Sequence, residues 1–165
     1  MADESLPEMP PINKIYIVNV YLLTVLLPFT AMSIESFGSK DKLSVAVLAK
    51  WFLFFAVGIR FLLGGIRQVV RAKMKTGEIF YIERKSCCPI VKELGFANLS
   101  FGAVAVVSLY VPSWRIVSAF SSSFYYGAAV LNGFFGKPAS ANEIFIRVSN
   151  GCIFVILLIL LLEMA

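Results

Sequence analysis

The sequence predicts an all-α transmembrane helical bundle. Of the 165 residues, 59% are hydrophobic, whereas soluble domains average about 45–50% apolar residues. Charged residues make up only 15%, against about 25% in an ordinary soluble domain. A single water-facing core of this size cannot enclose so much apolar surface. The long uncharged runs in the chain have the length that a bilayer requires.

Five helical spans account for these apolar runs. A helix needs about 20 apolar residues to cross the ~30 Å hydrocarbon layer. The run that starts at Ile15 is uncharged for 20 residues, and the run that starts at Ile116 for 21. The second span differs, because Arg60 interrupts it. The expected spans are Ile15–Ile34, Lys50–Gln68, Pro89–Val111, Ile116–Phe135 and Ile144–Leu162.

The chain divides into a polar N-terminal segment, residues 1–14, and a five-span transmembrane domain, residues 15–165. Pro28 lies inside the first span and should kink it, because proline has no N–H to donate to the preceding turn. Pro112 and Pro138 follow the third and fourth spans, where they prevent the helices from continuing. The links after the third and fourth spans are therefore expected to be turns.

The distribution of basic residues predicts that the N-terminus faces the inside of the membrane and the C-terminus the outside. Five spans place the two termini on opposite sides. Ten of the fifteen Lys and Arg residues then lie on the N-terminal side, four on the other side, and Arg60 within the membrane. Basic residues concentrate in cytoplasmic loops of membrane proteins. A cleaved signal peptide is the competing interpretation of the first span, but the acidic residues Asp3, Glu4 and Glu8 are atypical of such a leader.

Strongly polar residues inside the spans concentrate in the predicted inner half of the membrane. We interpret these residues as one polar intramembrane cluster and a candidate ligand pocket, because a charge in hydrocarbon usually marks a functional site. Glu143, Arg147 and Asn150 share one helix face at positions i, i+4 and i+7. The whole cluster comprises Arg60, Glu93, Asn98, Asn132, Glu143, Arg147 and Asn150.

Arg60 requires an acceptor in this arrangement. Glu93 is the first candidate, because the second and third spans are antiparallel neighbours, and Glu143 is the second. A structural interpretation remains open, in which Arg60 extends toward the membrane surface and Glu93 stabilises the first turn of its helix. Asn and Ser side chains would then only form hydrogen bonds between helices.

Small residues predict where the helices pack closely. The second span carries Gly58, Gly64 and Gly65, and the fourth carries a small-residue group at Gly127 to Ala129. In the third span, one face holds Gly95, Asn98, Gly102 and Ala105. Small side chains allow membrane helices to approach each other closely, so we expect these faces to form helix interfaces.

Few features of the sequence indicate chemistry. The chain has no histidine and three cysteines, and we expect neither a metal site nor a cofactor. Cys87 and Cys88 are adjacent and near the membrane; ordinary thiols are the simplest interpretation, and S-acylation is the alternative. The basic segment Arg67–Lys92 suits anionic lipid head groups. Its position beside a bilayer and its interspersed acidic residues disfavour nucleic acid as a partner.

Three segments resemble a family of small multi-pass membrane proteins of unknown function. They are WFLFFAVGIRFLLGGIRQ at residues 51–68, KELGFANLSFG at residues 92–102 and YYGAAVLNGFF at residues 125–135. That family is loosely similar to DoxX-like four-helix membrane proteins, which implies a four-helix core preceded by an N-terminal span. Members of the family often carry histidines where this chain has Gln68 and Asn132. Some DoxX-like relatives are associated with quinone-linked redox enzymes.

These features favour a multi-pass membrane protein without enzymatic activity, acting as an accessory or scaffold component of a membrane complex. Its partners would be the lipid bilayer and either another membrane protein or a second copy of the chain. Two alternatives remain. One is a small carrier or channel that uses the inner-half polar pocket, and the other is a quinone- or lipid-handling redox subunit. The sequence does not specify which membrane holds the protein.

Overall fold

The computed structural model describes residues 14–38, 44–70, 88–135 and 141–164, without the side chains of residues 141 and 142. Most of the polar segment 1–14 lies outside the described residues. So do residues 71–87, which include Cys87 and most of the basic segment Arg67–Lys92. Every regular element in the described part of the chain is a helix, as the sequence predicts.

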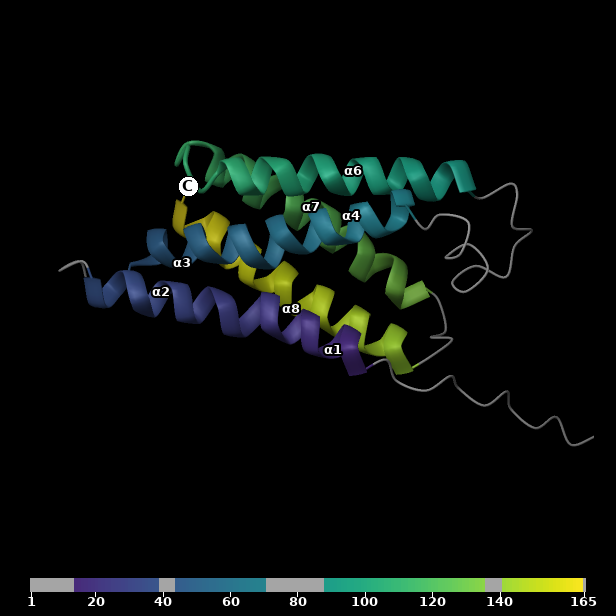
Figure 1. Ribbon diagram of the computed structural model, residues 1–165, viewed down its shortest axis with the longest axis horizontal. Helices are drawn as coiled ribbons and strands as arrows, with labels where there is room; N and C mark the ends of the chain where they lie inside the picture. Colours follow the sequence, from purple (N-terminus) through teal and green to yellow (C-terminus); the bar gives the residue numbers. More distant parts are fainter. Residues whose placement is uncertain (1–13, 39–43, 71–87, 136–140, 165) are drawn as a thin grey trace, which may run out of the picture.

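Five helical rods form the bundle (Figure 1). The first rod consists of α1 (Lys14–Tyr21), the π-helical segment η1 (Leu22–Leu26) and α2 (Leu27–Gly38). The second consists of α3 (Val45–Phe52), the π-helical segment η2 (Leu53–Ile59) and α4 (Arg60–Val70). The remaining rods are α6 (Cys88–Val107), α7 (Trp114–Phe135) and α8 (Ala141–Met164).

Four of the rods are long and apolar enough to cross a membrane: Lys14–Gly38, Val45–Val70, Cys88–Val107 and Glu143–Met164. The remaining rod, α7, has 22 residues but is less apolar, because serine and tyrosine residues occupy its middle. Helices occupy the positions of the five predicted spans, and most extend a few residues beyond them. That all five cross the membrane stays a prediction. The helices confirm a membrane-compatible helical bundle with four candidate spans.

Successive rods run in opposite directions (Figure 1). The start of α1 and the end of α8 therefore lie at opposite ends of the bundle. We call the end where α1, α6 and α8 begin the Lys14 end, and the other the Gly38 end. This alternation is the antiparallel arrangement expected of successive membrane spans.

The core lies between the second rod, α7 and α8. Phe52, Leu53 and Val57 of the second rod are buried together with Ile153 and Leu157 of α8. By contrast, many large apolar side chains on the outside of the bundle are exposed. Apolar side chains both inside and outside suit a bundle surrounded by lipid, because lipid solvates apolar side chains as well as a protein core does.

The second rod and α6 are in direct backbone contact. A Cβ atom added to Gly65 would lie 2.6 Å from the carbonyl oxygen of Gly95, and one added to Gly102 would lie 3.0 Å from the carbonyl oxygen of Gly58. Ala105 is fully buried on the same face. The predicted small-residue interface of the third span is therefore confirmed.

The two π-helical segments end close to Pro28 and Arg60, respectively. η1 precedes Pro28, which cannot donate to the carbonyl of Thr24, and the chain instead forms a wider turn in which the Leu27 N–H bonds the Leu22 carbonyl. η2 ends at Arg60, whose N–H bonds the carbonyl of Phe55. Such wide turns are frequent at functional sites. Here they place Thr24 and Arg60 within reach of each other.

Candidate functional site: a basic cavity at the Lys14 end

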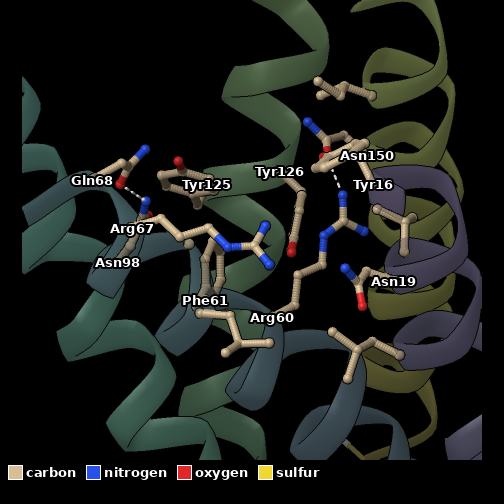
Figure 2. A pocket seen from close by; sticks show the side chains of 15 residues that line it. Tyr16, Asn19, Arg60, Phe61, Arg67, Gln68, Asn98, Tyr125, Tyr126 and Asn150 are labelled. Atoms are coloured by element: carbon tan, nitrogen blue, oxygen red, sulfur yellow. Dashed lines mark hydrogen bonds between the residues drawn. The ribbon is translucent and has the colours of Figure 1, made fainter. Parts of the chain in front are cut away.

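A cavity of about 230 Å³ lies among all five rods near the Lys14 end (Figure 2). Its walls combine aliphatic and aromatic side chains with polar groups that converge from separate helices. Such a combination is typical of small-molecule sites. The lining residues are Tyr16, Asn19, Val20, Leu23, Arg60, Phe61, Leu63, Gly64, Arg67, Gln68, Asn98, Tyr125, Tyr126, Ile146 and Asn150.

Arg60 connects three helices at the cavity wall. Its Nη1 donates to Ser149 Oγ at 3.0 Å, and its Nη2 donates to Asn150 Oδ1 at 3.1 Å on α8. A longer bond of 3.5 Å joins Nη1 to Thr24 Oγ1 of η1. The guanidinium carbon also lies 5.8 Å from the centre of the Tyr126 ring, a cation–π distance. All of these groups are neutral, so they orient the guanidinium without cancelling its charge.

The opposite wall is built on Asn98 and a group of aromatic rings. Asn98 Nδ2 of α6 donates to Gln68 Oε1 of α4 at 2.7 Å. Phe61 is stacked on Tyr126 with a ring separation of 5.2 Å and meets Tyr125 edge-on at 4.9 Å. These contacts fix the tyrosines of α7 against α4. Figure 2 shows the Gln68–Asn98 and Arg60–Asn150 hydrogen bonds on the two sides of Tyr126.

The cavity has a positive charge that its lining does not compensate. Arg60 and Arg67 both line it, and no Asp or Glu is among the lining residues that the structure describes. In Figure 2, the two arginine side chains lie on the two sides of Tyr126, with Arg60 extending toward Asn150. Arg60 is part-buried, so water screens its charge less than it would at an exposed surface, whereas Arg67 is exposed. The cavity is therefore electrostatically suited to an anionic group.

Two polar atoms of the lining have no hydrogen-bond partner among the described residues. They are the hydroxyl of Tyr126 and the side-chain oxygen of Asn98. Tyr126 is only 2% exposed and Asn98 only 4%. Buried polar groups are nearly always paired. A ligand in the cavity would provide partners for both atoms.

Three of the seven predicted cluster residues line the cavity, namely Arg60, Asn98 and Asn150. The other four do not: Glu93, Asn132, Glu143 and Arg147. Glu93 and Asn132 are exposed on their helices. The side chains of Glu143 and Arg147 form an ion pair at 2.6 Å, and Arg147 also donates to the carbonyl oxygen of Gly133. That pair connects α8 to the end of α7, outside the cavity.

The predicted ion pair between Arg60 and Glu93 is wrong. Among the described residues, Arg60 bonds Ser149, Asn150 and Thr24 instead. Gly95 and Asn98 face α4, and at about 100° per residue Glu93 is turned well away from both of them on the helix. The second candidate partner, Glu143, is bound by Arg147.

The site also contains residues that the sequence did not indicate as a group. Arg67 and Gln68 lie seven and eight residues after Arg60, so the helical period places them on the same face of α4 as Arg60. Tyr16 and Asn19 are one turn apart on α1. The spacing could have indicated that each pair shares a helix face. Nothing in the sequence indicated that either pair lies beside Tyr126.

A second polar group lies near the Gly38 end, where the sequence predicted mainly apolar residues. Lys50 forms an ion pair with Glu35 at 2.9 Å, and Trp51 Nε1 donates to the same carboxylate. This contact joins α2 to α3. Glu35 follows the predicted first span, which ends at Ile34, and Lys50 begins the second, so this contact lies at the ends of the predicted spans. The concentration of polar residues in the inner half stays a prediction.

Comparison with known protein families gives one match. The family of unknown function DUF6790 matches residues 18–162, which is nearly the whole described bundle. The chain belongs to this family. No curated protein and no solved structure matches the chain. The resemblance to a family of unknown function is thus confirmed, while the likeness to DoxX-like proteins stays a prediction.

Proposed function

We propose that this DUF6790 member is a five-span integral membrane protein that binds a small ligand in the cavity at the Lys14 end and acts as a carrier or ligand-binding subunit. One observation supports it most strongly. Arginine, asparagine, glutamine and tyrosine side chains from separate helices converge on one cavity within an otherwise apolar bundle. Polar groups are costly in hydrocarbon and usually mark a functional path or pocket there.

This proposal differs in emphasis from an accessory or scaffold role. A scaffold requires an outer face matched to a partner, and it has no use for a cavity that keeps an arginine among neutral groups. A redox subunit would additionally require a cofactor. The cavity therefore favours ligand binding, and the accessory role is retained as an outcome of the experiment below.

We further propose that the Lys14 end faces the inside of the membrane. Lys14, Arg67, Lys92 and Arg147 belong to that end of the bundle, whereas Lys50 and Arg115 belong to the Gly38 end. The same orientation follows from the positive-inside rule applied to the full sequence. Reporter domains fused to the two termini should report opposite sides, with the N-terminal reporter inside. Two reporters on one side would contradict the five-span arrangement.

Filling the cavity provides the test of ligand binding. A Cβ atom on Gly64, which lines the cavity, would meet no atom within 4 Å, so Gly64→Leu introduces a side chain whose first carbon has room beside the cavity. Gly38→Leu is the matched control, because Gly38 is equally open but lies at the far end of the first rod. Native mass spectrometry of the full chain in mild detergent should show a bound small molecule or lipid in the wild type and in Gly38→Leu.

The same molecule should be absent from Gly64→Leu. Equal binding by all three proteins would contradict a role for the cavity. A partner chain that is retained by all three, with no ligand that depends on Gly64, would support the accessory role instead.

A further inference from the structure

We infer that the ligand of this cavity presents an oxyanion, a phosphate or carboxylate group, which Arg60 and Arg67 bind together with the Tyr126 hydroxyl. This inference rests on the proposed function and specifies the chemical class of the ligand. A phospholipid head group and a free phosphate share this chemistry. They differ in the direction from which they would reach the cavity.

The hydrogen bonding of Arg60 supplies the first argument. A guanidinium carries five N–H donors, and three hydrogen bonds join Arg60 to described residues. Two donors are therefore available to a ligand. Ser149 and Asn150 hold the group in place, and such fixed guanidinium groups bind carboxylate and phosphate oxygens in pairs.

The charge balance supplies the second argument. The described lining contains Arg60 and Arg67 and no carboxylate. A cation in a membrane protein usually has a counter-charge or contact with water. An oxyanion between the two arginines would supply the counter-charge that the neutral partners of Arg60 do not.

The two buried atoms without partners supply the third argument. The Tyr126 hydroxyl can donate to a ligand oxygen, and Asn98 Oδ1 can accept from a ligand hydroxyl or from a protonated phosphate oxygen. Tyr126 also lies in cation–π contact with Arg60. A group that bonds Arg60 is thus positioned near this hydroxyl. A purely structural arginine does not account for these two unpaired atoms.

The size and surroundings of the cavity limit the ligand. About 230 Å³ is less than the ~300–1,000 Å³ of typical drug-sized sites, which suits a head group or a small anion. Leu63, which lines the cavity, is 39% exposed. This exposed apolar side chain marks where the acyl chains of a lipid would lie, while a free anion would arrive from the aqueous side at the Lys14 end.

Binding measurements on the purified full chain test the inference. The probes are inorganic phosphate, followed by calorimetry in neutral detergent, and phosphatidic acid against phosphatidylcholine, followed by native mass spectrometry. Inorganic phosphate or phosphatidic acid should bind the wild type, and phosphatidylcholine, whose phosphate is balanced by the choline cation, should bind more weakly than phosphatidic acid. Arg60→Gln should weaken that binding roughly 10- to 100-fold, the factor expected when charge-assisted hydrogen bonds are lost.

Two further arginine variants make the test specific. Arg67→Gln should also weaken binding, and it keeps the proposal testable if Arg60→Gln does not fold. Arg115→Gln is the control, because Arg115 is at the Gly38 end, where it donates to the Ser108 carbonyl; it should bind as the wild type does. Phosphate binding identifies a soluble anion, and binding of phosphatidic acid alone identifies a lipid head group.

Equal weakening by Arg115→Gln would overturn the inference, since it would indicate non-specific attraction to positive charge. Failure of both probes to bind would overturn it as well. These outcomes differ from failure of the proposed function. If a neutral molecule occupies the wild type and disappears from Gly64→Leu, the cavity function stands and only the oxyanion is excluded.

Discussion

Gly64 and Gly65 are adjacent in α4, yet they face opposite kinds of surroundings. A Cβ atom on Gly65 would meet the Gly95 carbonyl oxygen at 2.6 Å, whereas one on Gly64 would meet nothing within 4 Å. Gly65 belongs to the closed face of α4, which contacts the backbone of α6. Gly64 belongs to the open face, which carries Arg60 and borders the cavity. One helix thus has a face whose shape is fixed by backbone contact and a face that leaves room for a ligand.

The largest expected difference in the free energy of unfolding is between single substitutions of these two glycines. Gly65→Leu should lower the free energy of unfolding by about 3 kcal/mol, because a backbone carbonyl cannot move aside as a flexible side chain can. Gly64→Leu should change it by less than about 1 kcal/mol, since leucine has a higher helix propensity than glycine and its Cβ atom would meet no atom within 4 Å. Denaturant titration in detergent micelles measures both. Equal losses for the two variants would remove the distinction between the faces.

A smaller loss is expected across the same interface at Gly95. A Cβ atom there would meet the side-chain carbon Val69 Cγ2 at 2.8 Å and the carbonyl oxygen of Gly65 at 3.1 Å. Because the nearer atom belongs to a side chain that can shift, Gly95→Ala should lower the free energy of unfolding by about 1 kcal/mol. The same titration checks this value. A loss as large as that of Gly65→Leu would show that Val69 is held rigidly.

On the open face, Arg60 should be coupled to Asn150 and not to Glu93. A double-mutant cycle of Arg60→Leu with Asn150→Ala should give a coupling energy of about 1 kcal/mol, since hydrogen bonds between membrane helices are modest. The cycle of Arg60→Leu with Glu93→Gln should be additive within about 0.5 kcal/mol. Coupling to Glu93 with none to Asn150 would restore the ion pair that the structure contradicts.

The smallest effect is expected for Glu93 alone. Its side chain is exposed on α6, away from both faces of α4. Glu93→Gln should change the free energy of unfolding by less than about 0.5 kcal/mol, and it should not affect ligand binding in the native mass measurement. A clear loss of binding would mean that the cavity extends to Glu93.

The closed face could be predicted from the sequence, because it depends on periodicity alone. Gly95, Asn98 and Gly102 recur at helical spacing, and small residues at that spacing indicate close packing wherever the partner lies. The five rods could be predicted for a similar reason, since their length and apolar content follow from bilayer thickness. The predicted end of the first span, Ile34, was less accurate, because the helix continues past the apolar run to Gly38 and includes Glu35.

The open face could be predicted only in part, because it depends on tertiary contacts. Arg60 and Asn150 are 90 positions apart, and no local pattern relates them. Proximity in the chain suggested Glu93 as the partner, but the helical phase of α6 turns it away. Gly64 and Gly65 cannot be distinguished by residue type at all. Their difference appears only when α6 occupies one side of the helix.

A structure of the full chain in lipid nanodiscs, determined with phosphatidic acid and phosphate present, tests the central claim most directly. The account predicts a non-protein group beside Arg60, Arg67 and the Tyr126 hydroxyl, at the Lys14 end of five antiparallel rods, and the loss of that group in Arg60→Gln. A structure in which α1 closes onto α4 and fills the cavity, with Arg60 satisfied by protein groups alone, would contradict it.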